Sequence, residues 1–584
     1  MHLILTEIDK NLFAHQDKHF LYLGEWVFTE EGIDLGKNST VNQYHWNDIK
    51  KFNSDSEYIK VLQKKYFKFL YKKLNLIHGL KKSERFWKIV IGPWLNYFIE
   101  VLFDRWESIN NIINQEIDSV NISANCHENF IPYEFNDFLI SLNSHEVNHN
   151  LFSEIIKFRN RRGQLKIQNY KYINLNHNKK NLNRFIKKSF KNKLIKHLKF
   201  NFTYFIKKNK FLFISSGFSA KNTFKLKYLL GDFPYPDLEE TFSIDSKEYN
   251  YDMREKIKKL DNDTLFEEFI SEMIVKYLPF FYLENFAVAR QKADTLVLPI
   301  DPKIIFISAG FSQHDSFRLY IANKIEGKCK LLIGQHGGNY GSAKIHSIED
   351  FEIDVSDYFI TWGWIKNKKT IPLSKLWNNF TIKNKNLNCK KKILFADNEI
   401  GPYSSTIRSL ENSSQNTDLI KRSIKIIKKI ENYENRVDIK LYPKTNYWNQ
   451  KNIWKSFLPN IRFIEKIENK KIYKNYKLFI SCTNTTFFLE TLFHNLPTVI
   501  YFDQNISQLR DSAKSYFEIL ENVKILHYDY QGASNHINQV YNNAEDWWFK
   551  PDVQKARELF CLKFAKKNDN EINDLSNFIN SILI

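Results

Sequence analysis

A short stretch near residue 480 has the residue types and spacing that suit phosphate binding. Apolar residues 476–480 are typical of a buried strand, and a turn rich in hydroxyl and amide side chains, Ser481–Thr486, follows them. Residues 487–493 then give one apolar helical face, which puts the turn at a helix N-terminus. The free N–H groups and partial positive charge of such a terminus attract phosphate. A capped strand-to-helix crossover that binds nothing is the alternative.

A histidine framed by glycines is the second candidate for chemistry. His336 stands within Gly334–Gly338, directly after the apolar strand 331–333. Glycines let the backbone approach a ligand closely, and histidine takes up a proton near neutral pH. We therefore expect His336 to be a catalytic base, with binding of a phosphate or carboxylate as imidazolium as its alternative role. His314 and Asp315 form a further candidate catalytic pair, because the carboxylate could orient and charge the imidazole.

Strands and helices alternate along the chain, which predicts an α/β fold with parallel, doubly wound sheets. In such sheets ligands bind at the carboxyl ends of the strands. His336, Asp397, Lys444 and the turn 483–486 all follow predicted strands. The weakly periodic, Lys- and Asn-rich stretch 365–391 marks a domain boundary. We expect domains at 1–380 and 390–560 and a helical tail at 561–584.

Composition limits the classes of protein that are possible. The chain has 584 residues, 43% hydrophobic, which excludes a disordered protein and requires more than one core. The net charge of +20 suits nucleotides, anionic glycans or lipid surfaces, although the abundance of Lys, Asn and Ile is also what an AT-rich genome imposes. Five scattered cysteines indicate a reducing compartment, and neither a signal peptide nor an 18-residue apolar run is found. A cytoplasmic protein is expected, with peripheral membrane binding left open.

Two segments of the N-terminal half have a marked pattern. The aromatic block at 85–107 has helical spacing, and a buried helical face is favoured over a platform for stacking sugars. No Asp or Glu occurs from Ile155 to Gly231, and leucines, isoleucines and phenylalanines recur every four residues from 182 to 198 among lysines. That pattern predicts a basic amphipathic helix, which lies either on anionic lipid or against the protein core.

Several motifs together resemble a family of transferases encoded in bacterial surface-polysaccharide (O-antigen) loci. These motifs are Leu23-Gly24-Glu25-Trp26, Tyr44-His45-Trp46, Ile91-Gly92-Pro93-Trp94, Phe103-Asp104-Arg105-Trp106, Gly334-Gln335-His336-Gly337-Gly338, Thr361-Trp362-Gly363-Trp364 and Phe488-Leu489-Glu490-Thr491-Leu492. The stretch from Glu490 to Pro497-Thr498-Val499-Ile500 also looks like the donor-binding helix and strand of GT-B glycosyltransferases. The likeness spans almost the whole chain.

The resemblance implies a GT-B-like fold, in which two Rossmann-like domains face a cleft, here with a helix- and aromatic-rich N-terminal elaboration. It implies a metal-independent glycosyltransferase without a cofactor, acting on a nucleotide-sugar donor, CMP- or UDP-linked, and a glycan or lipid-linked acceptor. In that class the residue corresponding to Glu490 binds the donor ribose. The donor-binding candidates are Gln335, Gly337, Gly338, Asp397, Lys440, Lys444, Thr483, Asn484, Thr485, Thr486 and Glu490.

Other function classes stay open at this point. A weaker likeness is to polyol-phosphate transferases of wall teichoic acid synthesis and to Kdo transferases of capsule synthesis. The former pair a His-Gly turn with a His-Pro turn, and here the second turn reads Tyr442-Pro443. A nucleotide-sugar epimerase, which also has two Rossmann domains, and a non-catalytic membrane or polyanion binder are further alternatives. No P-loop lysine motif and no dense Arg/aromatic patch for nucleic acid is present.

The basic segment 182–200 yields a direct prediction. If it lies on lipid, vesicle binding of the protein should rise with the fraction of anionic lipid and fall with added salt, because the attraction is electrostatic. Cosedimentation with neutral and anionic vesicles measures this. Equal sedimentation with both kinds of vesicle would leave only the core-packed helix.

Overall fold

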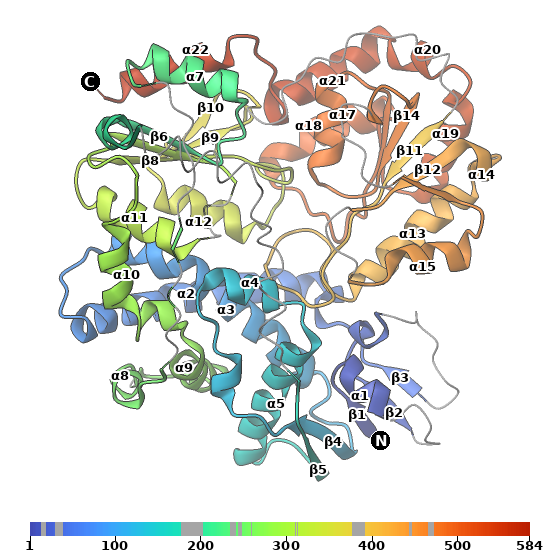
Figure 1. Ribbon diagram of the computed structural model, residues 1–584. Helices are drawn as coiled ribbons and strands as arrows, with labels where there is room; N and C mark the ends of the chain where they lie inside the picture. Colours follow the sequence, from blue (N-terminus) through green and yellow to red (C-terminus); the bar gives the residue numbers. More distant parts are fainter. Residues whose placement is uncertain are drawn as a thin grey trace.

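The computed structural model describes residues 1–12, 19–29, 39–176, 202–233, 241–242, 244, 248–258, 260–309, 311, 314–375, 392–442, 447–464 and 472–583. Within these residues the chain forms three separate β-sheets, in each of which all neighbouring strands run parallel. Figure 1 shows the N-terminal sheet below the other two, which lie side by side. The predicted α/β class with parallel, Rossmann-like sheets is confirmed.

The C-terminal sheet has the strand order that is typical of a Rossmann fold. Its strands are, in spatial order, β13 (Arg462–Ile464), β12 (Val437–Lys440), β11 (Ile393–Ala396), β14 (Leu478–Ser481), β15 (Thr498–Tyr501) and β16 (Leu526–His527). Numbered along the chain this is 3-2-1-4-5-6, which reverses direction between β11 and β14. Strands β14 and β15 are buried along their whole length, as expected for a parallel sheet covered on both faces.

The middle sheet follows chain order. Its strands are β10 (Thr370–Pro372), β9 (Tyr358–Thr361), β8 (Lys330–Gly334), β7 (Ile304–Ile307) and β6 (Phe211–Ile214). The C-terminal tail returns to this sheet: α22 (Glu571–Ser581) lies beside α7 (Ala220–Leu229) over the strands (Figure 1). Leu575 of α22 is 0% exposed within a cluster that includes Phe213 and Phe306.

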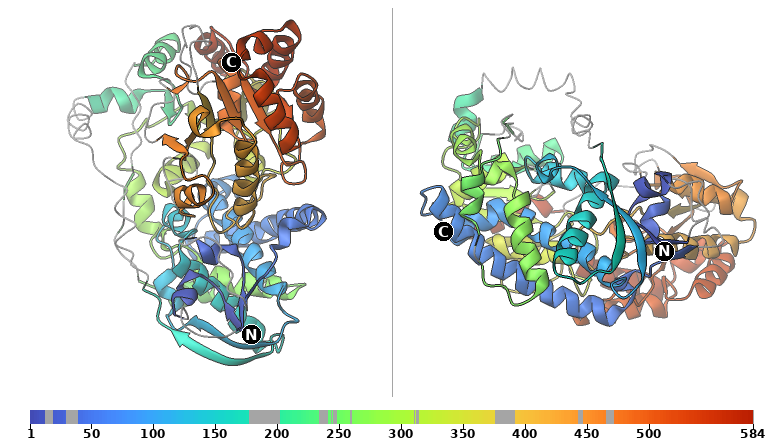
Figure 2. Two further views of the ribbon diagram at one scale, coloured as in Figure 1. Left: turned by 90° about the vertical axis from the view of Figure 1, so that its right-hand side faces the viewer. Right: turned by 90° about the horizontal axis from the view of Figure 1, so that it is seen from below.

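The N-terminal sheet was not predicted. It consists of β3 (Ser39–Val41), β2 (Phe20–Tyr22), β1 (His2–Ile4), β4 (Ile117–Ser123) and β5 (Ile167–Ile173). The sequence led us to expect one Rossmann-like domain with helical insertions over 1–380, whereas the structure has two sheets in that range. The boundary predicted near 380–390 lies mostly outside the described residues and stays a prediction. Figure 2 (left) places the N-terminus and the C-terminus at opposite ends of the molecule.

The aromatic block forms a buried helix, as predicted. It lies on α3 (Glu84–Asn110), which packs on α2 (Ile49–Ile77) and α11 (Asp315–Ile325). Trp87 and Trp94 are 0% exposed, so they form core contacts and not a platform for a sugar. By length and composition α3 could cross a membrane, but 83% of its apolar window is buried inside the protein.

The other helices connect the strands or cover the sheets. They are α1 (Glu7–Leu12), α4 (Phe135–Ser141), α5 (His145–Arg161), α8 (Tyr251–Glu255), α9 (Leu265–Tyr277), α10 (Phe286–Ala293), α12 (Ser347–Val355), α13 (Gln415–Lys428), α14 (Tyr433–Arg436), α15 (Gln450–Phe457), α17 (Thr486–Phe493), α18 (Asp511–Asn522), α19 (Tyr530–Val540), α20 (Ala544–Trp548) and α21 (Pro551–Phe564). The predicted basic helix at 182–200 lies outside the described residues.

Truncating Leu575 tests how much the returning tail contributes to stability. Leu575→Ala should lower the free energy of unfolding by about 2–5 kcal/mol, because it removes buried methyl groups and leaves a cavity. Chemical denaturation followed by circular dichroism measures the change. Asn577→Ala, at an exposed position of the same helix, should leave stability nearly unchanged. Equal stability of the two variants would show that α22 does not pack as described.

Candidate active site

A cleft of about 690 Å³ is lined by residues that follow strands of two sheets. His336 and Gly337 follow β8 of the middle sheet, whereas Asp397, Lys440 and Ser481 stand at the ends of β11, β12 and β14. The cleft therefore lies at the point where the order of the C-terminal sheet reverses. In open α/β sheets, ligands bind at this switch point, outside the carboxyl ends of the strands. We take this cleft as the candidate active site.

Gln335, a predicted donor-binding residue, instead holds the β8 turn together. Its side chain donates to Gly337 O at 2.9 Å, and its Oε1 accepts from Trp362 N at 3.0 Å and Trp364 Nε1 at 2.8 Å. The residue is 1% exposed and does not line the cleft. Its side-chain oxygen accepts two bonds and its Nε2 donates one, all within the protein, so we correct its role from donor binding to positioning of the turn.

Gly338 joins the two halves of the cleft. Its N–H donates to Thr486 Oγ1 at 2.8 Å, across from the middle sheet to the start of α17. A Cβ at this position would lie 2.3 Å from the backbone carbon of Thr485, closer than real Cβ contacts allow. A glycine is therefore required here by the close approach of two backbones. Gly337 and Gly338 both line the cleft, and their role in donor binding stays a prediction.

His336 stands in the cleft with two buried partners behind it. Its side chain is 30% exposed, and Tyr340 Oη lies 3.4 Å from Nε2. Tyr340 in turn donates to Glu352 Oε2 at 2.9 Å, and Glu352 Oε1 is 4.0 Å from His336 Nδ1. Burial lowers the pKa of His336 to about 4 and raises the pKa of Glu352 to about 8. An imidazole that is neutral at pH 7 suits a base better than it suits an anion-binding imidazolium.

The predicted pair of His314 and Asp315 is not part of this cleft. Asp315 begins α11 and is 0% exposed. Its carboxylate accepts from Phe135 N and Tyr282 Oη, both at 2.6 Å, and it forms an ion pair with Arg318. Neither His314 nor Asp315 lines the cleft. A buried carboxylate must be paired, and here the pairing anchors α11, so we correct its role from catalytic to structural.

The predicted donor turn belongs to the C-terminal sheet and contacts the glycine-rich turn that carries His336. Thr483, Thr485 and Thr486 line the cleft at the start of α17, and the Thr483 and Thr485 hydroxyls are 3.1 Å apart. Asn484 points elsewhere: its Nδ2 donates to Ser342 Oγ at 3.3 Å, and it does not line the cleft. Its amide therefore ties the turn to the β8 side.

Glu490 is buried in α17 and also lines the cleft. Tyr473 Oη donates to one of its carboxylate oxygens at 2.6 Å. A carboxylate oxygen has more than one lone pair, so this bond leaves acceptor capacity toward the cleft. The position fits the predicted bond to a ribose hydroxyl, which stays a prediction.

Two other predicted donor residues lie at strand ends in the cleft. Asp397 Oδ2 accepts from Trp454 Nε1 at 2.7 Å, and burial raises the pKa of this carboxyl to about 7. Lys440 also lines the cleft; burial lowers the pKa of its amine, and the charge of Glu490 opposes that shift. Lys444 lies outside the described residues. In the described part of the chain, no group of three or more His, Cys, Asp or Glu side chains is placed to hold a metal ion.

The tryptophan-containing motifs of the N-terminal half support one wall of the cleft from the side that faces away from it. They hold the loop 397–414, which forms one wall of the cleft between β11 and α13. Arg105 Nη1 donates to Ser404 O at 2.6 Å, Glu25 N donates to Ser414 Oγ at 3.2 Å, and Gln415 Nε2 donates to Trp46 O at 3.1 Å. Tyr403 lines the cleft, and its ring packs against Trp26 with the ring centroids 5.6 Å apart. These motifs position the site without lining it.

Sequence reasoning missed several polar residues of the cleft, among them Asn339, His346 and Arg408. Asn339 is 2% exposed, has a positive φ of 73°, and neither atom of its side-chain amide has a partner in the described structure. Strained backbone and unpaired buried amides mark functional sites. The only sequence signal for Asn339 is its place in the glycine-rich turn. Nothing local marks Arg408.

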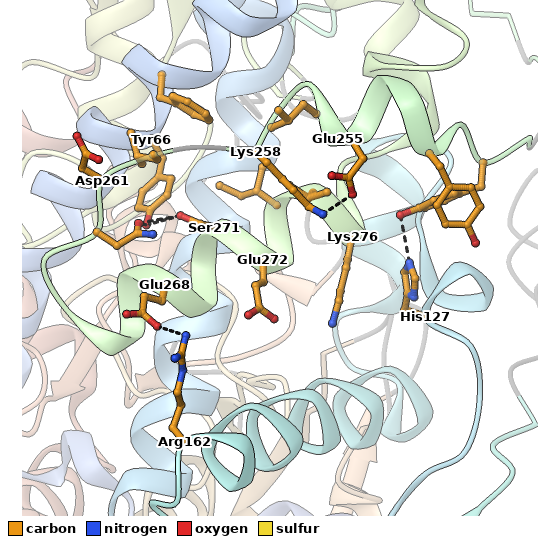
Figure 3. A pocket seen from close by; sticks show the side chains of 18 residues that line it. Tyr66, His127, Arg162, Glu255, Lys258, Asp261, Glu268, Ser271, Glu272 and Lys276 are labelled. Carbon is orange, nitrogen blue, oxygen red and sulfur yellow. Dashed lines mark hydrogen bonds and ion pairs between the residues drawn. The ribbon is translucent and has the colours of Figure 1, made fainter.

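A second pocket of about 720 Å³ lies away from the cleft, between α2, α8 and α9 (Figure 3). Its charged side chains are largely paired with one another: Arg162 with Glu268 at 2.5 Å, and Lys258 with Glu255. His127 Nε2 lies 3.3 Å from Tyr249 Oη. Because its polar groups already have protein partners, this pocket gives no sign of a ligand.

A family model described as LIC12162 family transferase matches residues 1–579, and the chain therefore belongs to that family. No curated protein matches the chain. Among solved structures the chain is similar to TarM, at 13% identity and a TM-score of 0.34, over 51% of this chain and 58% of TarM. It is also similar to MurG of Acinetobacter baumannii, at 10% identity and a TM-score of 0.27, over 50% of this chain and 77% of MurG.

A further similar structure is the complex of S. aureus MnaA with UDP, at 9% identity and a TM-score of 0.33, over 51% of this chain and 78% of MnaA. Likenesses at these values say nothing about the reaction of this chain. Membership of the transferase family and the geometry of the cleft are what bear on its function.

Replacing Glu490 tests the predicted ribose contact. Glu490→Ala should weaken nucleotide binding about ten- to a hundred-fold, the usual effect of losing a hydrogen bond to a charged group of about 1.5–3 kcal/mol. Isothermal titration calorimetry with UDP, GDP, CDP, CMP and TDP measures the affinity. Glu521→Ala removes an exposed carboxylate of α18 and serves as the control. Unchanged affinity in a folded Glu490→Ala protein would rule out the contact.

Proposed function

We propose that this member of the LIC12162 transferase family is a glycosyltransferase that needs no metal. It moves a sugar from a nucleotide-activated donor, UDP- or CMP-linked, to an acceptor glycan. One observation carries the proposal: His336 and Glu490 line the same cleft from opposite halves, at the switch point of a Rossmann sheet. A base for the acceptor on one wall and a ribose ligand on the other are what a transfer between two bound substrates requires.

The proposal extends to the setting of the reaction. The acceptor is a growing surface glycan of the O-antigen, capsule or lipopolysaccharide class, free or lipid-linked, and the enzyme works at the cytoplasmic face of the membrane. The resemblance of its tryptophan-containing motifs to transferases of O-antigen loci supports this setting. The charge of +20 and the acid-free stretch 155–231 support peripheral binding to an anionic membrane surface.

The transfer we propose is a single displacement. The acceptor hydroxyl gives its proton to the neutral imidazole of His336, whose side chain lines the cleft. The acceptor oxygen then bonds to the anomeric carbon, and the bond from that carbon to the donor phosphate breaks. Its electron pair leaves with the nucleotide phosphate, whose charge Lys440 and the N–H groups at the start of α17 stabilise.

Product analysis separates the proposal from its two alternatives on the same fold. A polyol-phosphate transferase would move phosphate with the polyol, and an epimerase would convert the nucleotide sugar without any acceptor. Thermal-shift screening against nucleotide sugars identifies the donor, because a ligand that binds the native state raises Tm. Mass spectrometry with that donor and acceptor then shows whether a bare sugar is transferred. A product without acceptor, or one that retains phosphate, would overturn the proposal.

Replacing His336 tests the base. His336→Ala should lower kcat by about 10²–10⁴, the usual range for loss of a general base, with donor affinity nearly unchanged. His336→Asn keeps a hydrogen-bonding group but takes no proton near neutral pH, so it should be almost as inactive. Steady-state kinetics and donor titration on the folded variants measure both. Loss of donor affinity would assign His336 to the donor phosphate, and near-normal kcat would remove it from the mechanism.

The pH dependence follows from the same residue. Burial lowers the pKa of His336 to about 4, so the neutral, proton-accepting form is present above that value. The kcat/KM of wild-type protein should therefore hold from neutral pH down to about pH 5 and fall as the pH passes through about 4. A profile of kcat/KM against pH, restricted to conditions in which the protein stays folded, measures this. Activity that rises as the pH falls would indicate an imidazolium role.

A further inference from the structure

Arg408 brings a guanidinium into the cleft. Its side chain lines the cleft, is partly buried, and makes no ion pair or side-chain hydrogen bond within the described residues. The carboxyl of Glu100 is close enough to be affected by its charge. Glu100, however, already accepts from Ile407 N at 2.8 Å and from Gln63 Nε2 at 2.9 Å, so it is held by other groups.

His346 places a second hydrogen-bond donor beside Arg408. Its Nδ1 accepts from Glu349 N at 3.1 Å at the start of α12, so this nitrogen carries no hydrogen. Burial keeps the imidazole neutral by lowering its pKa well below the usual value, and the ring hydrogen must then be on Nε2. His346 lines the cleft, and the structure gives Nε2 no hydrogen-bond partner among the described residues.

The backbone aims both side chains the same way. His346 and Arg408 are opposite each other in an antiparallel bridge, and Ser347 N donates to Ile407 O at 3.0 Å beside it. Residues opposite each other in an antiparallel pair project their side chains to the same face, about 5 Å apart at Cβ. The side chains of His346 and Arg408 therefore project to the same side of the bridge, and both line the cleft.

The carboxylates of the cleft do not neutralise this pair. Glu490 accepts from Tyr473, Asp397 accepts from Trp454, Glu399 accepts from Tyr447 N, and Glu411 pairs with Arg422 at 3.3 Å. Arg408 lies opposite His346 in the bridge, and the His346 ring is 4.4 Å from the ring of Tyr340, which is itself 5.3 Å from the ring of His336. The loop that carries Arg408 therefore brings it close to His336, the proposed base for the acceptor.

We infer that Arg408 and His346 form an anion-binding subsite on the acceptor side of the cleft, and that the acceptor carries a carboxylate or a phosphate group near the hydroxyl that reacts. A guanidinium with a neighbouring N–H donor matches the oxygens of both groups. That the bound anion belongs to an acceptor rests on the proposed transferase function, but the anion subsite itself does not depend on that function. A uronic acid residue and a sugar phosphate are the two sources of the charge.

Binding of charged and neutral sugars tests the subsite. The probes are methyl glucuronide for the carboxylate, glucose 6-phosphate for the phosphate, and methyl glucoside as the neutral control, each titrated by ligand-observed NMR. Wild-type protein should bind at least one charged probe about ten-fold or more tightly than the neutral one. Which charged probe binds better identifies the source of the anion.

Variants then locate the preference. Arg408→Gln should abolish the preference for the charged probe, and Arg408→Lys should retain part of it. His346→Asn, which can still cap α12 through its side-chain oxygen, should weaken it and serves if Arg408→Gln does not fold. Arg290→Gln removes a partly buried arginine of α10 outside the cleft and should leave the preference intact.

Nucleotide binding, measured in parallel, separates this inference from the proposed function. UDP or CMP affinity should be unchanged in Arg408→Gln, and its loss would place Arg408 in the donor seat and overturn the inference. A wild-type protein that binds nucleotide but shows no preference for either charged probe would also overturn it. Charged-sugar binding that depends on Arg408 in a protein that binds no nucleotide would support the subsite and contradict the glycosyltransferase proposal.

Discussion

A buried guanidinium connects the N-terminal unit to the cleft. Arg105 is 0% exposed, and a charge at such a depth is tolerated only when it is paired and hydrogen-bonded. It pairs with Asp104 at 2.6 Å and donates to Ser404 O in the cleft wall. Burial acts to raise the pKa of Asp104, but the Arg105 charge and bonds from His45 and Tyr44 outweigh it and hold the pKa below its usual value. The buried Arg105 thereby holds the loop 397–414 in place on the side away from the cleft.

The opposite wall depends on close backbone contact. Because Gly338 touches Thr485 and donates to Thr486, the glycine-rich turn and the donor turn are placed relative to each other by direct contact. Gln335 fixes the same turn to the tryptophans that follow β9. The cleft is therefore bounded by two segments, each held by buried polar contacts that reach another part of the chain. Some of these contacts join two family motifs, as Gln335 does with Trp362 and Trp364.

The sequence predicted the parts of the site that depend on local pattern. An apolar run followed by a hydroxyl-rich turn placed Thr483–Thr486 at the start of α17, and the glycines placed His336 after β8. The N-terminal sheet escaped prediction because β1, β2 and β3 have 3 residues each, too few to show a strand pattern. Gln335 and Asp315 were misassigned because their partners are distant in sequence. Arg408 and His346 are brought together by a β-bridge between segments that are far apart in the sequence, and no local sequence pattern predicts such a pairing.

The electrostatics of the cleft suggest how its chemistry is timed. His346 is held neutral by burial and by nearby cations, Arg408 among them, and His336 by burial alone, so His336 by itself is a weak base. An anionic donor and an anionic acceptor would each bring negative charge close to His336 in a water-poor cleft. Negative charge nearby favours the imidazolium and raises the pKa of the base toward the working pH, where proton transfer is most efficient. On the proposed mechanism, His336 would thus become an effective base only when both substrates are in place, which would protect the activated donor from water.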